Sequence, residues 1–223
     1  MVNMINLEKI KETISKRKPK PVDVNRHYAV AVPLYFNEKK GIYEVIYEVR
    51  SRHISQPMEI SFPGGRLEKD ESYEEAAIRE TCEELLISSD KIEVIGEMDY
   101  LVTTGVMTIR CFLVLIKDVD IDQIEPDKNE VDHIFTVPLS FLANEKPLES
   151  VLTMNVEEDT SFPYELIPNG RKYNFSKAKN IVLFYEYNNY IIWGFTAKMT
   201  RSTIKILDEL GVLNEFLQQD KLS

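Results

Sequence analysis

The chain has 223 residues, of which 43% are hydrophobic and 29% charged, so it can bury a sizeable core. Its formal net charge of −10 argues against a general nucleic-acid binder, which usually carries a basic face, although metal ions or local cations can let an acidic protein bind phosphates. The chain has no apolar run of membrane-spanning length and opens without a secretion-signal pattern, so we expect a soluble, cytoplasmic protein that binds neither nucleic acid nor membrane.

Periodic apolar patterns predict the elements of the first half of the chain. They indicate a short amphipathic helix at 5–16, strands at 27–36 and 41–51 around a hairpin loop, a segment at 58–65 that ends in a Pro-Gly-Gly turn, and a helix at about 73–86. A basic stretch with prolines follows the first helix. We therefore expect residues 1–26 to form a helix and linker, and residues 27–223 to form a single domain.

The second half continues the mixture of strands and helices. The patterns predict strands at 92–102 and 107–116 joined around Gly105, a strand and a short helix opened by Pro138 within 131–144, a strand at 148–157, a hairpin strand at 187–195, and helices at 196–210 and 213–222 split at Gly211. Strands and helices alternate irregularly, with several hairpin-like pairs. This pattern predicts an α/β (α+β) fold in which helices flank a mixed sheet.

The expected helix at 73–86 has a clear start and one apolar stripe. Ser72, followed three residues later by Glu75, forms a capping box pattern. The residues expected to be buried fall at helical spacing and are Ile78, Thr81, Cys82 and Leu85. The helix should therefore pack one side against the core.

Three glutamates, Glu80, Glu83 and Glu84, also fall at helical spacing and are expected on the opposite side of this helix, beside two small alanines. Like charges at this spacing repel and cost stability, and a solvated acidic face usually interleaves basic residues. Arg79 is the single cation in this part of the helix, and Glu71 adds a fourth carboxylate just upstream. A hard divalent cation such as Mg²⁺, which prefers oxygen ligands, would offset the repulsion.

Two glycines precede this acidic helix. Gly64 and Gly65 let the backbone approach an ion or a ligand closely, and the carbonyl of Gly65 is a usable ligand. Together, the loop with these glycines and the helix with the carboxylates predict a metal-binding loop–helix–loop.

This segment resembles the signature of the Nudix hydrolases. That signature is a Gly, five residues, a Glu, seven residues, then Arg-Glu-apolar-any-Glu-Glu-any-Gly-apolar. The matching positions here are Gly65, Glu71, Arg79, Glu80, Glu83, Glu84 and Ile87. Two positions depart from it, because Leu86 stands at the second glycine and Thr81 at an apolar position. The resemblance implies an α/β/α sandwich that holds Mg²⁺ or Mn²⁺ and hydrolyses a nucleoside diphosphate linked to another moiety.

The resemblance and the chemistry of pyrophosphate hydrolysis suggest roles for the box residues. Metal ions neutralise the charge of the pyrophosphate and activate a water. Glu80 and Glu84 lie one helical turn apart and are the first candidate metal ligands, with Glu83 and the Gly65 carbonyl next. Glu80 or Glu83 could instead orient or deprotonate the water. The resemblance implies that Arg79 pairs with Glu71 to brace the loop, whereas Glu71 as a direct ligand is the weaker alternative.

The flanks of this segment resemble the coenzyme A pyrophosphatase branch of the family. The matching residues are Arg50, Ser51, Glu59, Ile60, Phe62, Pro63, Trp193, Gly194, Thr196 and Ala197, and the resemblance extends over about residues 27–210. Candidate substrate-binding residues are therefore Arg50, Gly64 and Phe62, with the Arg50 guanidinium suited to phosphate.

Several flanking residues also have a structural interpretation. We favour the core for the aromatic residues Trp193 and Phe195. Arg50 could pair with a surface acid, and Glu130 could either reach the metals or lie exposed in a loop.

We expect hydrolysis of coenzyme A or acyl-coenzyme A to 3′,5′-ADP and a 4′-phosphopantetheine, with a coenzyme A-like small nucleotide as the substrate and a homodimer as one option for assembly. Another nucleoside diphosphate derivative, such as ADP-ribose or a dinucleotide, is the enzymatic alternative. A non-catalytic nucleotide-binding regulator is the other, although such proteins usually lose box carboxylates.

Overall fold

The computed structural model describes residues 7–103, 107–155, 157 and 161–218. The predicted joint at Gly105 lies outside these residues, as do the first two residues of the predicted helix at 5–16 and the last four of the predicted helix at 213–222. The helices are α1 (Leu7–Ser15), α2 (Tyr73–Leu85), α3 (Leu139–Asn144), α4 (Gly194–Glu209) and α5 (Leu213–Gln218). Short 3-10 helices lie at Ser89–Lys91, Ile121–Gln123, Tyr164–Leu166 and Gly170–Lys172.

The strands form two sheets. The larger sheet contains β1 (Arg26–Asn37), β2 (Ile42–Arg50), β3 (Ile60–Ser61), β4 (Gly64–Arg66), β5 (Ile92–Glu97), β6 (Leu101–Val102), β7 (Met107–Ile116) and β8 (Val131–Pro138). The smaller one contains β9 (Leu148–Met154), β10 (Ala178–Tyr187) and β11 (Tyr190–Trp193).

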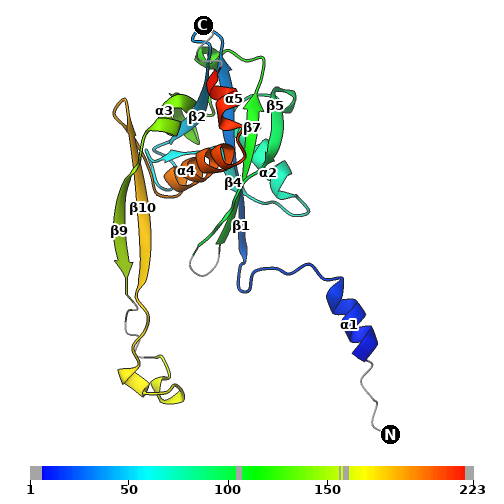
Figure 1. Ribbon diagram of the computed structural model, residues 1–223, viewed down its shortest axis with the longest axis vertical. Coiled ribbons are helices and arrows are strands. Elements are labelled where there is room, and N and C mark those ends of the chain that lie inside the picture. The colour runs from blue at the N-terminus through cyan, green and yellow to red at the C-terminus, as the bar shows by residue number, and fades with distance from the viewer. Residues whose placement is uncertain (1–6, 104–106, 156, 158–160, 219–223) are drawn as a thin grey trace.

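The larger sheet is mixed, as the sequence predicts. Its central pair, β1 and β7, is parallel over ten residue pairs, and the other strand pairs are antiparallel. The strand order is β3-β2-β1-β7-β5, with β4 on β1, β6 on β7 and β8 on β2. The pairing of β4 with β1 places the glycine segment against the central strand, directly beneath α2 (Figure 1).

Helices cover both faces of the larger sheet, which confirms the sandwich architecture. On one face, alanines of α2 pack with Ala29, Ala31 and Phe112 of the central strands. On the other face, α3, α4, α5 and the smaller sheet enclose a second core around Tyr47 and Leu113. Two separate cores, one on each side of a single sheet, are the physical basis of the three layers.

The smaller sheet differs most from the sequence-based expectation. The predicted hairpin strand at 187–195 is confirmed as β11 only over Tyr190–Trp193, because a two-residue turn at Asn188 and Asn189, both with positive φ, separates β10 from β11. Such turns favour asparagine, which tolerates this conformation. The segment Gly194–Phe195 already belongs to α4. Strand β9 lies at the sheet's edge, every residue of it is exposed, and β9 and β10 extend away from the sandwich (Figure 1).

One other predicted strand differs in the structure. The expected strand at 92–102 is interrupted between β5 and β6.

Helix α1 buries no residue and stands apart from the sandwich (Figure 1). The division of the chain at residue 26 stays a prediction. Within the described part of the chain, no helix is both long and apolar enough to span a bilayer.

Candidate active site

Helix α2 carries the predicted carboxylates, and its ends are fixed by local chemistry. The Ser72 hydroxyl accepts from the Glu75 N–H at 3.2 Å, and the Glu75 carboxylate accepts from the Ser72 N–H at 2.9 Å, so the capping box is confirmed. The helix ends at Leu86 in the left-handed conformation, with φ 52° and ψ 40°. A glycine normally occupies such a position because a side chain there is strained. The motif's backbone conformation is therefore kept although its glycine is not.

The buried face of α2 is wider than the predicted stripe. Its buried residues are Ala76, Ala77, Thr81, Glu84 and Leu85. Ile78 and Cys82 are only partly buried. The expectation that all three glutamates face away from the core is wrong for Glu84, which is 4% exposed, whereas Glu83 is exposed and Glu80 lies between. Alanines let the helix approach the sheet closely, and this approach encloses Glu84.

Arg79 offsets much of the repulsion among the glutamates. Its Nε lies 2.8 Å from Glu71 Oε1, and its Nη1 lies 2.9 Å from both Glu80 Oε1 and Glu83 Oε2. Its Nη2 also donates to the second Glu71 oxygen and to the Arg66 carbonyl. The hydrogen bond from Arg79 lowers the pKa of Glu71. The structure thus brings Arg79 and Glu71 together, in a pair that ties the loop at 66–71 to the helix.

The two glycines fit closely beneath the helix. The Gly64 N–H donates to Glu84 Oε2 at 2.8 Å. A Cβ added to Gly65 would lie 2.1 Å from Glu80 Oε1, and one added to Gly64 would lie 2.4 Å from the Ala29 carbonyl. No other residue fits at either position without displacing a carboxylate or a strand. The glycines therefore determine where Glu80 and Glu84 lie.

Burial and mutual repulsion destabilise the charged forms of the two inner carboxylates. Burial is the main cause of a rise in the pKa of Glu84 to about 8; the Gly64 N–H opposes the rise, and the charges of Glu80 and Glu130 contribute to it. Burial likewise raises the pKa of Glu80, against the effect of Arg79. A bound cation would remove this penalty.

Two further glutamates belong to the same cluster. Glu130 precedes β8 in a loop that is anchored to α2, since the Asp127 N–H donates to the Glu84 carbonyl at 2.9 Å. Its negative charge acts on Glu48, Glu80 and Glu84, so the alternative that Glu130 approaches the metal site gains support. Glu48 of β2 is buried beside them, and sequence reasoning missed it because a glutamate in an alternating strand is expected to face solvent.

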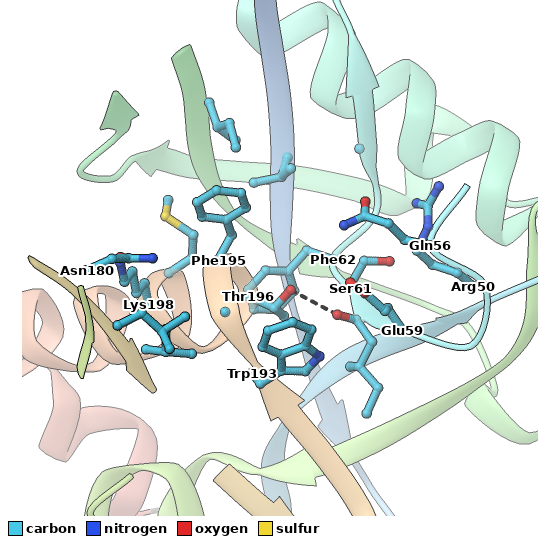
Figure 2. Close-up of a pocket in the computed structure, with 18 residues that line it drawn as sticks. Arg50, Gln56, Glu59, Ser61, Phe62, Asn180, Trp193, Phe195, Thr196 and Lys198 are labelled. Carbon is cyan, nitrogen blue, oxygen red and sulfur yellow. Dashed lines mark hydrogen bonds between the residues drawn. The ribbon is translucent and has the colours of Figure 1, made fainter. Parts of the chain in front are cut away.

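A cavity of about 340 Å³ adjoins this cluster. Its lining includes Gly64, Arg50 and Gln56 at the carboxylate end, and Figure 2 shows Asn180 and Lys198 at the opposite end. Apolar side chains of β7, β9, β10 and α4 line the space between. Its size and mixed lining are typical of a small-molecule site.

The aromatic residues of this cavity differ from the expectation. We favoured the core for Trp193 and Phe195, and that is wrong, because they are 40% and 48% exposed and line the cavity. They lie at the junction of β11 and α4, where Thr196 Oγ1 donates to the Ile60 carbonyl and holds the junction against β3 (Figure 2). Phe62 also borders the cavity, yet it is 5% exposed and stacks on Tyr47. Its position is mainly structural.

Two cationic residues lie at opposite ends of the cavity. The Arg50 Nε donates to the Ser55 carbonyl, and the Arg50 charge lowers the pKa of Glu84. Lys198 of α4 donates to Asn180 Oδ1 at 2.8 Å, and it has no carboxylate partner within the described residues. Sequence reasoning missed Lys198 and Asn180, because they come from separate elements and belong to no short motif.

The donor set of this site fits a hard divalent cation. Its side-chain donors are carboxylate oxygens, which Mg²⁺ and Mn²⁺ prefer. Glu48 Oε1 is buried without a hydrogen-bond partner among the described residues, and the space that a Cβ at Gly65 would fill is occupied by the Glu80 carboxylate. Among the described residues, no three His, Cys, Asp or Glu side chains already converge as a finished metal site.

The sequence of this chain is similar to a known family model and to several known proteins. A model of the NUDIX domain matches residues 25–153. A protein named Nudix hydrolase 3 from Caenorhabditis elegans is 26% identical over 212 residues, which are 91% of this chain and 82% of that protein. A mitochondrial coenzyme A diphosphatase from Mus musculus is 27% identical over 182 residues, covering 80% of this chain and 77% of the relative.

A second mitochondrial coenzyme A diphosphatase, from Homo sapiens, is 30% identical over 117 residues, or 51% of this chain and 49% of that protein. Among solved structures, a MutT/nudix family protein from Enterococcus faecalis is 14% identical over 92% of this chain and 70% of its own, with a TM-score of 0.47. A likeness at that score adds no argument of its own. The family match over residues 25–153 carries the assignment.

Proposed function

The chain belongs to the Nudix hydrolase family, and from that premise we propose that it cleaves the pyrophosphate of coenzyme A or acyl-coenzyme A. In this reaction the oxygen of a water forms a bond to one phosphorus, and the bond between that phosphorus and the bridging oxygen breaks. The water's protons end on solvent and on the leaving phosphate. The products are 3′,5′-ADP and 4′-phosphopantetheine, or its acylated form.

The observation that carries this proposal is the pairing of opposite charges across one cavity. Arg50 and Gly64 border one end, where the Gly64 N–H binds Glu84 of the carboxylate cluster, and Lys198 with Asn180 borders the other. Coenzyme A carries a phosphate on its ribose 3′-oxygen in addition to the pyrophosphate. ADP-ribose lacks that second anionic group. We assign Lys198 to the 3′-phosphate and Arg50 to the pyrophosphate.

More basic side chains adjoin Lys198 outside the cavity. A shallower depression next to it is lined by Lys179, Arg201 and Lys205 as well as by Lys198 and Asn180. Arg201 pairs with Glu149, and Lys205 Nζ lies 3.2 Å from Glu209, so their charges are partly neutralised. In a chain of net charge −10, this basic surface favours an anionic group at that end of the cavity.

The aromatic lining supports the same substrate class. Trp193 and Phe195 are partly exposed at the middle of the cavity, between the two cationic ends (Figure 2). An exposed aromatic face offers a stacking surface for a purine base. An adenosine with phosphates at both its 3′ and 5′ positions would place its anions toward the two ends.

The proposed roles of the box residues follow from their positions. As a family, Nudix hydrolases depend on divalent metals, which neutralise the pyrophosphate and activate water. Glu84 and Glu80 would hold the ion, with Glu83 and the Gly65 carbonyl as further donors. Glu80 or Glu83 would orient the attacking water and accept its proton. Arg79 and Glu71 would keep the loop in place, and Gly64 would position Glu84 through its N–H.

Two alternatives remain distinguishable by experiment. Another nucleoside diphosphate derivative, such as ADP-ribose or a dinucleotide, would share the metal chemistry and would not need Lys198. A non-catalytic regulator would not need the full carboxylate set, and all four box glutamates are present here. We also propose a cytoplasmic location, to be checked with a fluorescent fusion because two relatives are named as mitochondrial, and a homodimer, to be checked by sedimentation.

A substrate panel tests this proposal. With Mg²⁺ or Mn²⁺, we expect kcat/KM for coenzyme A to exceed that for dephospho-coenzyme A and ADP-ribose at least about tenfold, as one charge-assisted contact of ~1.5 kcal/mol would give. Lys198→Gln should remove most of this gap. Lys205→Gln, two turns along the same helix and outside the cavity lining, should keep it. Equal or better cleavage of ADP-ribose by the unmodified protein would contradict the coenzyme A assignment.

A further inference from the structure

Glu48 is a buried carboxylate with one oxygen, Oε1, that has no hydrogen-bond partner among the described residues. It lies in β2 opposite Ser61 of β3, and it is 1% exposed. Within the part of the chain that the structure describes, the Ser61 hydroxyl is likewise buried without a partner. A buried carboxylate without a partner destabilises the folded state strongly. Its Oε1 is therefore available to a ligand that the described residues do not supply.

The same strand shows how this fold satisfies a carboxylate that serves structure. Glu44, four residues earlier in β2, is also completely buried. Its carboxylate accepts from Asn37 Nδ2 at 2.8 Å, from Lys40 Nζ at 2.8 Å and from Thr136 Oγ1 at 3.1 Å. Two glutamates of equal burial on one strand thus have opposite environments. The difference indicates that Glu48 is not placed to stabilise the chain.

The surroundings of Glu48 are the box carboxylates. Burial raises the pKa of Glu48 well above its usual value, and the negative charges of Glu84, Glu130 and Glu80 raise it further, while Arg50 opposes them. The strand β3 that pairs with this part of β2 leads directly into Gly64, whose N–H binds Glu84. Ile46, two residues before Glu48 in β2, packs with the alanines of α2, so Glu48 lies on the face of the sheet that α2 covers and approaches the glutamates from the sheet.

From these contacts we propose that Glu48 is an additional oxygen ligand of the divalent cation held by Glu80 and Glu84. This inference rests on the proposed metal site, but it does not depend on which substrate is cleaved. It adds to the helix ligands one carboxylate from the sheet, which the sequence signature does not contain. The cation would satisfy the orphaned Oε1 and would link α2 to β2.

The test compares two matched variants of the full chain, Glu48→Gln and Glu44→Gln. Mn²⁺ and Mg²⁺ binding is measured by titration calorimetry, and the melting temperature is measured in EDTA and in excess metal. We expect Glu48→Gln to weaken metal binding at least about tenfold and to shrink the metal-induced rise in melting temperature, with no loss of melting temperature in EDTA. We expect Glu44→Gln to lower the melting temperature in EDTA and to leave the metal affinity unchanged.

Two outcomes would overturn the inference. One is that Glu48→Gln binds Mn²⁺ as tightly as the unmodified protein. The other is that it loses stability in EDTA as Glu44→Gln does, which would make Glu48 a structural residue. If Glu48→Gln does not fold, Glu48→Asp, which keeps the charge but retracts it, should still show weakened metal binding.

Glu84→Gln separates this inference from the proposed site itself. Weakened binding in Glu84→Gln together with unchanged binding in Glu48→Gln would reject the sheet ligand alone. Unchanged binding in both variants would reject the box carboxylates as the metal site.

Discussion

The two ends of the cavity are built in different ways. The acidic end comes from one continuous stretch, residues 64–84, with contributions from β2 and the loop before β8. The basic end is assembled from β10 and α4, which enter the fold much later in the chain. A site can therefore combine an end that belongs to a whole family with an end that is particular to one chain. In the proposed function, the first end would provide the chemistry and the second would select the substrate.

The two ends also differ in how firmly their side chains are held. Glu80, Glu83 and Glu71 all bind Arg79, and Glu84 binds the Gly64 N–H, so the acidic end is braced from within. Lys198 is held by a single amide. Changes at the acidic end should consequently affect every substrate alike, and changes at the basic end should alter preference.

The largest expected effect comes from breaking the acidic end. Glu84→Gln removes a buried oxygen donor from the metal site, and we expect turnover to fall by roughly 10² or more for every substrate. The rise in melting temperature that Mg²⁺ or Mn²⁺ produces should shrink as well. Turnover within a few-fold of the unmodified protein would show that Glu84 is not a metal ligand.

A second change, Arg50→Ala, distinguishes the two ends directly. Arg50 lies at the carboxylate end, so we expect kcat/KM to fall about tenfold on coenzyme A, dephospho-coenzyme A and ADP-ribose alike, as the loss of one charged phosphate contact would give. The ratio between substrates should stay constant, in contrast to Lys198→Gln. A selective loss on coenzyme A would place the 3′-phosphate at Arg50 instead.

The charge of the acidic end should appear in the pH dependence of stability without metal. The pKa of Glu84 is about 8 in the folded chain, far above its value in the unfolded chain. A raised carboxyl pKa means that the folded state is favoured while the group is protonated, and that this stability is lost as the pH rises through about 8. In EDTA, the melting temperature should therefore be lower at pH 9 than at pH 6. Glu84→Gln should flatten this slope, and an unchanged slope would assign it to other groups.

The smallest expected effect concerns the end of α2. Leu86 is 63% exposed and left-handed, so Leu86→Gly loses little apolar burial and relieves a strain of ~1–2 kcal/mol. The extra conformational freedom of glycine in the unfolded chain destabilises the folded state and offsets roughly 0.5–1 kcal/mol of that gain. We expect a net stabilisation of about 0.5 kcal/mol in denaturant unfolding with unchanged metal affinity. A destabilised variant would mean that the Leu86 side chain makes a contact that matters.

The sequence predicted the elements whose signals are local. The capping box at Ser72 and the hairpin between β1 and β2 depend on neighbouring residues, and both are present. The box glutamates could be identified for the same reason, since their spacing within one helix is itself the signal. Even the position of Leu86 was found, although its left-handed backbone became visible only in the structure.

The features that the sequence could not supply depend on tertiary packing. The burial of Glu84 follows from how closely α2 approaches the sheet, which helical periodicity does not encode. Glu48 has the same local pattern as an exposed strand residue, and only the sheet pairing shows it to be enclosed. Trp193 was placed in the core because most tryptophans are buried, whereas the junction of β11 and α4 turns it toward the cavity.

Strand β9 has a consequence for handling the protein. Its outer edge pairs with no other strand of the described chain, and it exposes Leu148, Val151, Leu152 and Met154. An unprotected apolar edge is a template on which another copy can add a strand. Concentrated stocks should therefore form larger assemblies slowly during storage, and Val151→Lys should slow their formation.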